Sequence, residues 1–130
     1  MGIDDMLAQA RSALERAEPD DAWRLQAEGA LLVDIRPIAN RAAEGEIPGS
    51  VPVERIHLEW RLDPASDHRL PQVHADLPVV VVCNEGYASS LAAADLRRLG
   101  LSRATDLVGG FRAWRAAGLP VRPGGTPAVP

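Results

Sequence analysis

Four consecutive valines, Val79 to Val82, are the feature that most limits how this chain folds. β-Branched residues favour extended backbone, and an unbroken apolar run is typical of a strand that is covered on both faces. Such strands belong to parallel sheets, whose helical crossovers cover both sides. Cys83, the only cysteine among 130 residues, follows directly, so the one thiol lies at the carboxyl end of a predicted central strand.

Other apolar segments alternate between strand and helix patterns along the chain. Strands are predicted for residues 31–35, 51–53, 78–83 and 105–108. Helices are predicted for residues 6–17, 20–29, 40–46, 55–62, 89–100 and 109–118. This alternation predicts an α/β fold, with helices on both faces of a central, mainly parallel sheet. Ligands of such sheets bind beyond the carboxyl ends of the strands, which is where Cys83 lies.

Two helices carry more detailed predictions. Asp20 or Asp21 is expected to cap the helix that begins there, because a carboxylate can accept hydrogen bonds from the free amides of the first turn. Ile56 and Trp60 lie four residues apart, which predicts that they share one face of the 55–62 helix. The three tryptophans are interpreted as core residues: Trp23, Trp60 and Trp114.

Length and composition predict one domain, since 130 residues with 46% hydrophobic content can bury a continuous core. We expect a helical extension at residues 1–19, the domain itself at 20–121, and a flexible tail at 122–130. The tail RPGGTPAVP is rich in proline and glycine, a composition typical of disorder. The polar stretch from Asp63 to Pro78 has three prolines and is predicted to be a loop.

Charge and cysteine usage argue against several classes of protein. A net charge of −4 argues against nucleic acid or an anionic membrane as the main partner. A single cysteine forms no internal disulfide, and the acidic N-terminal stretch does not resemble a signal peptide, so we expect a cytoplasmic protein. The histidines match no zinc pattern, and no metal or cofactor is expected. The oligomeric state is left open.

The segment CNEGYASS, which follows the valines, places the thiol just before a predicted helix start. Backbone amides there have no partner within the helix, and together with the helix dipole they favour an anion. Gly86 allows the positive φ that turns the chain inward. We therefore expect Cys83 to hold a thiolate or persulfide anion; the alternative is a buried cysteine that only packs. The amides expected to line the site belong to Asn84, Glu85, Gly86, Tyr87, Ala88 and Ser89.

Four segments together resemble the single-domain rhodanese family, over residues 20–121. They are LLVDIR (31–36), GEIPGS (45–50), VVVVCNEGYASS (79–90) and LVGGFRAWRAAGLPV (107–121). The resemblance implies a sulfurtransferase in which Cys83 attacks a sulfur donor, holds the sulfur as a persulfide and passes it to a thiol or other nucleophilic acceptor. Donor and acceptor are each expected to be a small molecule or a protein. The main alternative is a non-catalytic rhodanese-like module that binds a partner or senses oxidants through the same thiol.

The loop departs from the family at the positions that often carry cations. Family loops often have Arg directly after Cys and Arg or Thr five residues after it, where this chain has Asn84 and Ala88. Glu85 adds a negative charge. We therefore expect poor turnover of the dianion thiosulfate and better turnover of a protein persulfide or small organic persulfide. Phosphatases with a similar cysteine loop need Arg six residues after Cys, but position 89 is Ser, which argues against that activity.

Residues around this loop are given supporting roles. Asp34 and Arg36, at the end of the first strand, are interpreted as a structural ion pair or a backbone anchor; the alternative is direct contact with the substrate. Glu46 stands where the family usually has His, so no role of that His is carried over. Gly109 and Gly110 are interpreted as a place of close backbone packing, not as a phosphate loop.

Three polar side chains of the loop have open alternatives. Tyr87 either stands at the mouth of the pocket or packs on a neighbouring loop. Ser89 and Ser90 either donate hydroxyls to the thiolate or cap the following helix, and we expect at least one of them to cap.

Overall fold

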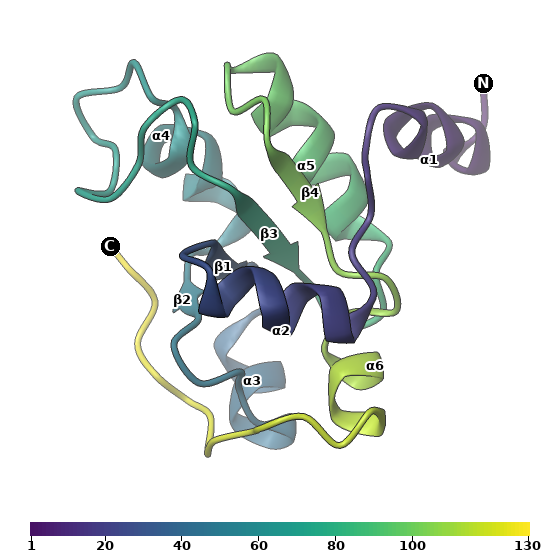
Figure 1. Cartoon of the computed structure of the whole chain (residues 1–130), viewed down its shortest axis with the longest axis vertical. Helices are drawn as coiled ribbons and strands as arrows, with labels where there is room; N and C mark the ends of the chain where they lie inside the picture. The colour runs from purple at the N-terminus through teal and green to yellow at the C-terminus, as the bar shows by residue number, and fades with distance from the viewer.

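The structure, a computed structural model, describes residues 1–130 and consists of one sheet with helices on both of its faces (Figure 1). The strands are β1 (Leu31–Asp34), β2 (Val51–Pro52), β3 (Val79–Val82) and β4 (Ala104–Asp106). The α-helices are α1 (Ile3–Ser12), α2 (Pro19–Ala27), α3 (Ile38–Glu44), α4 (Leu58–Leu62), α5 (Ala88–Arg98) and α6 (Gly110–Ala116). A short 3₁₀-helix, η1 (Arg55–His57), precedes α4. No helix is both long and apolar enough to cross a bilayer.

The four strands are all parallel and lie in the order β2-β1-β3-β4. Val79 pairs with Leu31 on one side and with Ala104 on the other, so β3 is a central strand, as the valine run predicts. From β1 the chain moves to one side of the sheet, and from β3 it moves to the other. The strand order therefore reverses between β1 and β3, and crevices at such reversals bind ligands. The predicted α/β fold with a parallel sheet is confirmed.

The valines of β3 alternate between two core layers because successive side chains of a strand point to opposite faces. Val79 and Val81 belong to the larger layer, which α4 and α5 cover. Val80 and Val82 belong to the smaller layer, which α2 and α6 cover. Trp114 of α6 is fully buried there, as predicted. Coverage on both faces explains why all four positions are apolar.

Two tryptophan predictions are wrong, because Trp23 is 49% exposed and Trp60 is 60% exposed. Helix α4 buries Leu58 and Leu62 instead of the pair Ile56 and Trp60. Both pairs have a spacing of four residues, so periodicity alone does not tell which one faces the core. In α2, Ala22 is buried, and its neighbour Trp23 points about 100° away around the helix.

The N-terminal helix is shorter than predicted, and the residues that follow it pack on the edge of the sheet beside β4. Helix α1 ends at Ser12, not at residue 17. Ala17 forms a single parallel bridge beside β4, where its amide donates to the Asp106 carbonyl (3.0 Å) and its carbonyl accepts from the Val108 amide (2.8 Å). The predicted caps of α2 are wrong: Glu18 is the N-cap and the helix begins at Pro19, which suits a first helical position.

The stretch 63–78 contains neither helix nor strand, as predicted, and it adds Leu70, Val73 and Leu77 to the larger core layer. The C-terminal tail, although its composition predicts flexibility, lies along the molecule in the structure. Arg122 pairs with Glu46 through two backbone hydrogen bonds of 2.9 Å, and the Val129 amide donates to the Pro52 carbonyl (2.9 Å). The side chain of Glu46, which is buried, also binds Arg122 and Thr126 of the tail. The mobility of residues 122–130 stays a prediction.

Candidate active site

The thiol of Cys83 lies at the carboxyl end of β3, beside the point where the strand order reverses. Cys83 is 8% exposed, so it is largely buried but not sealed. Its Sγ accepts hydrogen bonds from the Gly86 amide (3.2 Å) and the Ser89 amide (3.4 Å). Two amide donors on one sulfur, at the start of α5, favour a negative charge on that sulfur.

Gly86 takes the backbone conformation that this arrangement needs, with φ of +85°. A side chain here would also meet backbone atoms, because an added Cβ would lie 2.7 Å from the Gly109 nitrogen and 3.1 Å from the Leu107 carbonyl oxygen. The predicted positive φ is confirmed. Glycine is therefore required both by the turn and by the space around it.

Four further backbone amides belong to the same loop. None of them donates to a protein acceptor: Asn84, Glu85, Tyr87 and Ala88. They precede or begin α5, where no intrahelical carbonyl is available to them. Of the six amides that the sequence predicts, two therefore bind Sγ directly and four remain as free donors in the same short loop.

The loop rests on the Gly109-Gly110 segment at the start of α6. The Phe111 amide donates to the Cys83 carbonyl (2.8 Å). Gly110 has φ of +64°, and a Cβ on it would lie 2.5 Å from the Cys83 carbonyl oxygen. The predicted close backbone packing is confirmed, and it holds the carbonyl of Cys83 in place.

Asp34 and Arg36 form the expected ion pair, which is buried and 2.7 Å long. The Arg36 guanidinium also donates to the Gly45 carbonyl (2.8 Å) and to Asn84 Oδ1 (3.3 Å), and it lies 4.1 Å above the Phe111 ring centroid. The pair thus connects the end of β1 to the residue after Cys83. It lies beside the loop and does not contact Sγ.

Ser89 and Ser90 do not act as predicted. Both hydroxyls donate to Asp106 Oδ2, each at 2.8 Å, and neither caps α5, whose N-cap is Tyr87. Asp106 is fully buried at the end of β4 and also accepts two hydrogen bonds from Arg16, at 2.9 and 3.1 Å. Sequence reasoning missed this acid; its one local signal is its place at the carboxyl end of a strand.

Two arginines that sequence reasoning also missed bind the outer side of the loop. Arg11 donates to the Gly86 carbonyl (2.7 Å) and Ser90 Oγ (3.1 Å), and Arg16 donates to the same carbonyl (3.0 Å). The Arg11 guanidinium also lies 5.6 Å from the Tyr87 ring centroid. Tyr87 is 59% exposed, so it stands at the surface of the loop and contacts α1.

Charged residues surround the other side of the loop. Arg112 of α6 binds Glu85 (3.0 Å) and Glu44 (3.1 Å), while Glu44 also accepts from Asn84 Nδ2 (2.8 Å). Hydrogen bonds from Arg112 and Asn84 hold the pKa of Glu44 below its ordinary value. The hydrogen bond to Glu44 raises the pKa of Arg112 in turn.

Glu46, at the position of the family's His, is buried and far more constrained than a surface acid. It binds Arg41 (2.7 Å), Arg122 (3.2 Å) and the Thr126 hydroxyl (2.7 Å). Burial raises the pKa of Glu46, but the hydrogen bonds from Thr126 and Arg41 outweigh it and the pKa lies below its ordinary value. Glu46 therefore holds α3 and the tail together.

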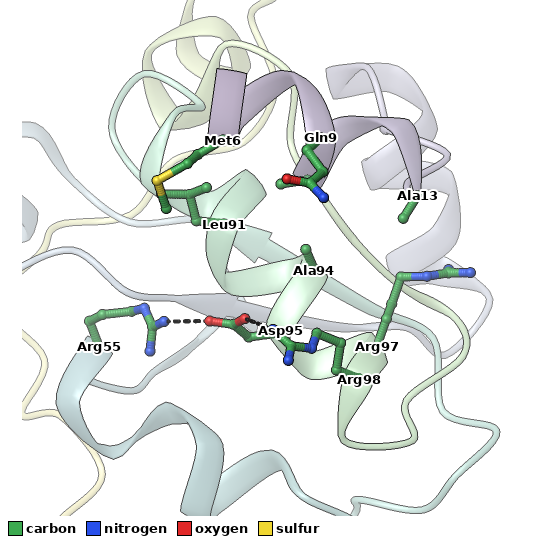
Figure 2. A pocket seen from close by; sticks show the side chains of 10 residues that line it. Met6, Gln9, Ala13, Arg55, Leu91, Ala94, Asp95, Arg97 and Arg98 are labelled. Atoms are coloured by element: carbon green, nitrogen blue, oxygen red, sulfur yellow. Dashed lines mark hydrogen bonds and ion pairs between the residues drawn. The ribbon is translucent and has the colours of Figure 1, made fainter. Parts of the chain in front are cut away.

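A separate groove lies between α1 and α5 (Figure 2). Met6 and Gln9 of α1 face Leu91 and Ala94 of α5 across it, in a space of about 770 Å³. Cys83 is not among its lining residues. The chemistry of the loop is therefore separate from this groove.

The comparison with family models decides which family this architecture belongs to. Residues 18–117 match the model of the rhodanese-like domain. The chain belongs to the rhodanese-like domain family. The matched part of this rhodanese-like chain includes the sheet and the Cys83 loop but begins after α1 and Arg16.

Known relatives of this rhodanese-like chain agree with that assignment. It is 39% identical over 109 residues to the thiosulfate sulfurtransferase GlpE of Ectopseudomonas mendocina (strain ymp), covering 81% of this chain and 88% of the relative. It is 36% identical over 104 residues to GlpE of Pseudomonas fluorescens (strain SBW25), covering 80% and 87%. The expected resemblance to rhodanese-like sulfurtransferases is confirmed at the level of the family.

A solved structure extends the similarity to nearly the whole chain. It is that of a protein of unknown function from Rhodopseudomonas palustris CGA009, described as a possible tyrosine phosphatase. The two share 37% sequence identity, with a TM-score of 0.84 over 94% of this chain and 95% of the other. The fold expected from the resemblance is confirmed.

Proposed function

We propose that this protein is a sulfurtransferase that carries sulfane sulfur as a persulfide on Cys83. The observation that supports it most directly is the pair of amides, from Gly86 and Ser89, that donate to Cys83 Sγ. Four unpartnered amides of the same loop are available to a second sulfur atom. A persulfide is an anion, and backbone amides at a helix start stabilise anions without a metal.

The transfer takes place in two displacements. In the first, the Cys83 thiolate attacks the outer sulfur of the donor, the new S–S bond forms, and the donor's bond to that sulfur breaks. The leaving group keeps the bonding electrons, so a persulfide donor departs as a thiolate. In the second, an acceptor thiolate attacks the outer sulfur and Cys83 departs as a thiolate. Each step is a thiol–persulfide exchange, so no external oxidant or reductant is consumed.

We infer that an organic or protein persulfide is a better donor than thiosulfate. The loop contains no cationic side chain, and the guanidinium groups of Arg11 and Arg16 bind the Gly86 carbonyl on its outer side. At the exposed side, the positive charge of Arg112 is met by Glu85 and Glu44. A dianionic donor therefore finds no cationic side chain within the loop that could contact it, whereas a persulfide depends less on such a contact.

The donor preference is tested by measuring kcat/KM for thiosulfate and for a small organic persulfide, with the same thiol acceptor. We expect the value for the persulfide to be at least about tenfold higher, because each unfavourable charge contact costs on the order of 1 kcal/mol. Replacing Glu85 with Gln should raise the value for thiosulfate and leave that for the persulfide nearly unchanged. Equal values for the two donors would contradict the proposed preference.

A phosphatase function, which the description of the Rhodopseudomonas protein suggests for that protein, has less support here. Position 89, where such enzymes need Arg, is Ser89, and its hydroxyl is committed to Asp106. Hydrolysis of p-nitrophenyl phosphate at a rate comparable to sulfur transfer would reverse this assignment. A non-catalytic sensing module is the remaining alternative, and oxidation of Cys83 by peroxide without any sulfur loading would favour it.

A further inference from the structure

The N-terminal segment lies outside the part of the chain that matches the family model, yet it reaches the loop of Cys83. The match begins at residue 18, whereas α1 spans Ile3–Ser12 and is followed by the bridge at Ala17. That bridge attaches the segment to the outer edge of β4, and α1 packs beside α5 (Figure 1). Two of its side chains, Arg11 and Arg16, therefore face the loop from outside.

Both arginines bind the same carbonyl, that of Gly86. Arg11 Nη2 donates to it at 2.7 Å and Arg16 Nη2 at 3.0 Å, while the amide of Gly86 donates to Cys83 Sγ at 3.2 Å. Two cations therefore hold the carbonyl of Gly86, and the sulfur of Cys83 accepts from its amide on the other side. Hydrogen bonds with an ionised donor are the stronger kind, so this orientation of Gly86 is well fixed.

Asp106 gives the second amide a similar support. The carboxylate accepts Ser89 Oγ and Ser90 Oγ at 2.8 Å each, and Arg16 closes on it in a bidentate pair at 2.9 and 3.1 Å. Arg16 is 19% exposed and Asp106 is fully buried, so the pair is shielded from salt. The Ser89 amide, which donates to Sγ, is therefore held by a network that ends in the N-terminal segment.

We propose that Arg11 and Arg16 are positioning residues of the sulfur site: they hold the amides of Gly86 and Ser89 toward Sγ, and Arg11, which has no carboxylate partner, adds positive charge behind these amides. The proposal rests on the proposed role of Cys83 as a sulfur carrier. In this sequence the loop itself has no cation, since the positions after Cys83 hold Asn84 and Ala88. The N-terminal segment places two guanidinium groups against the carbonyl of Gly86, whose amide donates to the sulfur.

The effect of Arg11 and Arg16 on the potential at Cys83 is tested by alkylating Cys83 with anionic iodoacetate and with neutral iodoacetamide. The ratio of the two rate constants cancels the reactivity of the thiol and reports the potential that an approaching anion meets. We expect the ratio to fall by about threefold or more in Arg11→Gln and in Arg16→Gln, since a charge at such range is only partly screened. The rate of sulfur loading from a persulfide donor should fall in the same variants.

Matched variants separate the charge from structural damage. Arg11→Lys and Arg16→Lys keep the charge and should restore most of the ratio. Arg115→Gln is the control, because Arg115 is exposed and its side chain makes no hydrogen bond or ion pair. If Arg16→Gln fails to fold, Arg11→Gln still decides, since the Arg11 guanidinium binds the Gly86 carbonyl, Ser90 and the Tyr87 ring and no buried carboxylate.

An alkylation ratio in both Gln variants equal to that of the parent and of Arg115→Gln would overturn the proposal, whatever the thermal stability of the variants. The two proposals fail in different ways. If the unmodified protein takes up no sulfur from any donor, the sulfur-carrier role fails, while the alkylation ratio still reports whether Arg11 and Arg16 act on an anion at Cys83.

Discussion

At the scale of single residues, Gly86 has the narrowest range of acceptable side chains in the site. Its φ of +85° is costly for any L-residue with a Cβ, by about 1–2 kcal/mol. The added Cβ would also lie 2.7 Å from the Gly109 nitrogen, a backbone atom that has no freedom to rotate away. The turn at Gly86 and the aim of its amide at Sγ are therefore coupled.

We expect Gly86→Ala to lower sulfur-transfer activity by more than about tenfold, because the amide that donates to Sγ moves with the strained backbone. The matched control is Gly100→Ala. Gly100 also has a positive φ, of +112°, but a Cβ there meets no atom within 4 Å. Thermal unfolding and kcat/KM of the two variants separate strain from site damage. Equal activity losses in both variants would contradict the account.

Residue-level predictions from the sequence hold where the signal is local. The positive φ of Gly86 and the packing at Gly110 follow from glycine within a short segment. The partner of Ser89 could not be predicted in the same way, because Asp106 lies 17 residues further along the chain. The two predicted roles of the serines, donation to the thiolate and capping of α5, both involve groups nearby in the sequence, whereas the structure joins the serines to a distant buried acid.

At the scale of elements, strands were more predictable than helix faces. An apolar run needs only to be covered on both sides, and Val79–Val82 satisfies this as predicted. A short helix offers several stripes with the same spacing, and α4 buries Leu58 and Leu62 where Ile56 and Trp60 were expected. With only five residues, α4 gives the hydrophobic pattern too little length to discriminate between stripes.

Helix α3 and the C-terminal tail are connected through Glu46, whose pKa is lowered by Thr126 and Arg41 against the effect of burial. A carboxyl whose pKa is lower in the folded protein than in the unfolded chain stabilises the fold when the pH is above its unfolded pKa, which is near 4.5. This stabilisation is lost as the pH falls through the folded pKa. We expect Glu46→Gln to have a lower Tm than the parent at pH 7. The two melting temperatures should converge as the pH falls below about 4.5.

The control for this pH profile is Glu54→Gln, because Glu54 is exposed and forms no ion pair. Its Tm should stay close to that of the parent at every pH. A constant gap in Tm between Glu46→Gln and the parent from pH 7 to pH 3 would show that the ionised form of Glu46 does not stabilise the fold.

At the scale of the whole molecule, the site is assembled from segments that lie far apart in the sequence. Arg11 and Gly86 are 75 residues apart in sequence, and no pattern along the chain links them. The sequence identifies the strand, the loop and the helix that follow one another around Cys83. The positions of Arg11 and Arg16 depend instead on how the N-terminal segment packs on the edge of β4, which only the folded structure reveals.

The same scale explains where the thiol stands. The order β2-β1-β3-β4 puts the reversal of the sheet between β1 and β3, and Cys83 follows β3 directly. Arg36, just beyond β1, reaches across this point to Asn84. The sheet topology therefore sets the position of the Cys83 sulfur, the loop amides bind it, and Arg11 and Arg16 hold the loop from its outer side.

The most direct test is the intact mass of the protein after incubation with a persulfide donor and removal of excess donor. The account predicts a gain equal to one sulfur atom, its loss on addition of a thiol acceptor, and no gain in Cys83→Ser. A parent protein that gains no mass, or a Cys83→Ser variant that gains as much as the parent, would contradict the role assigned to Cys83.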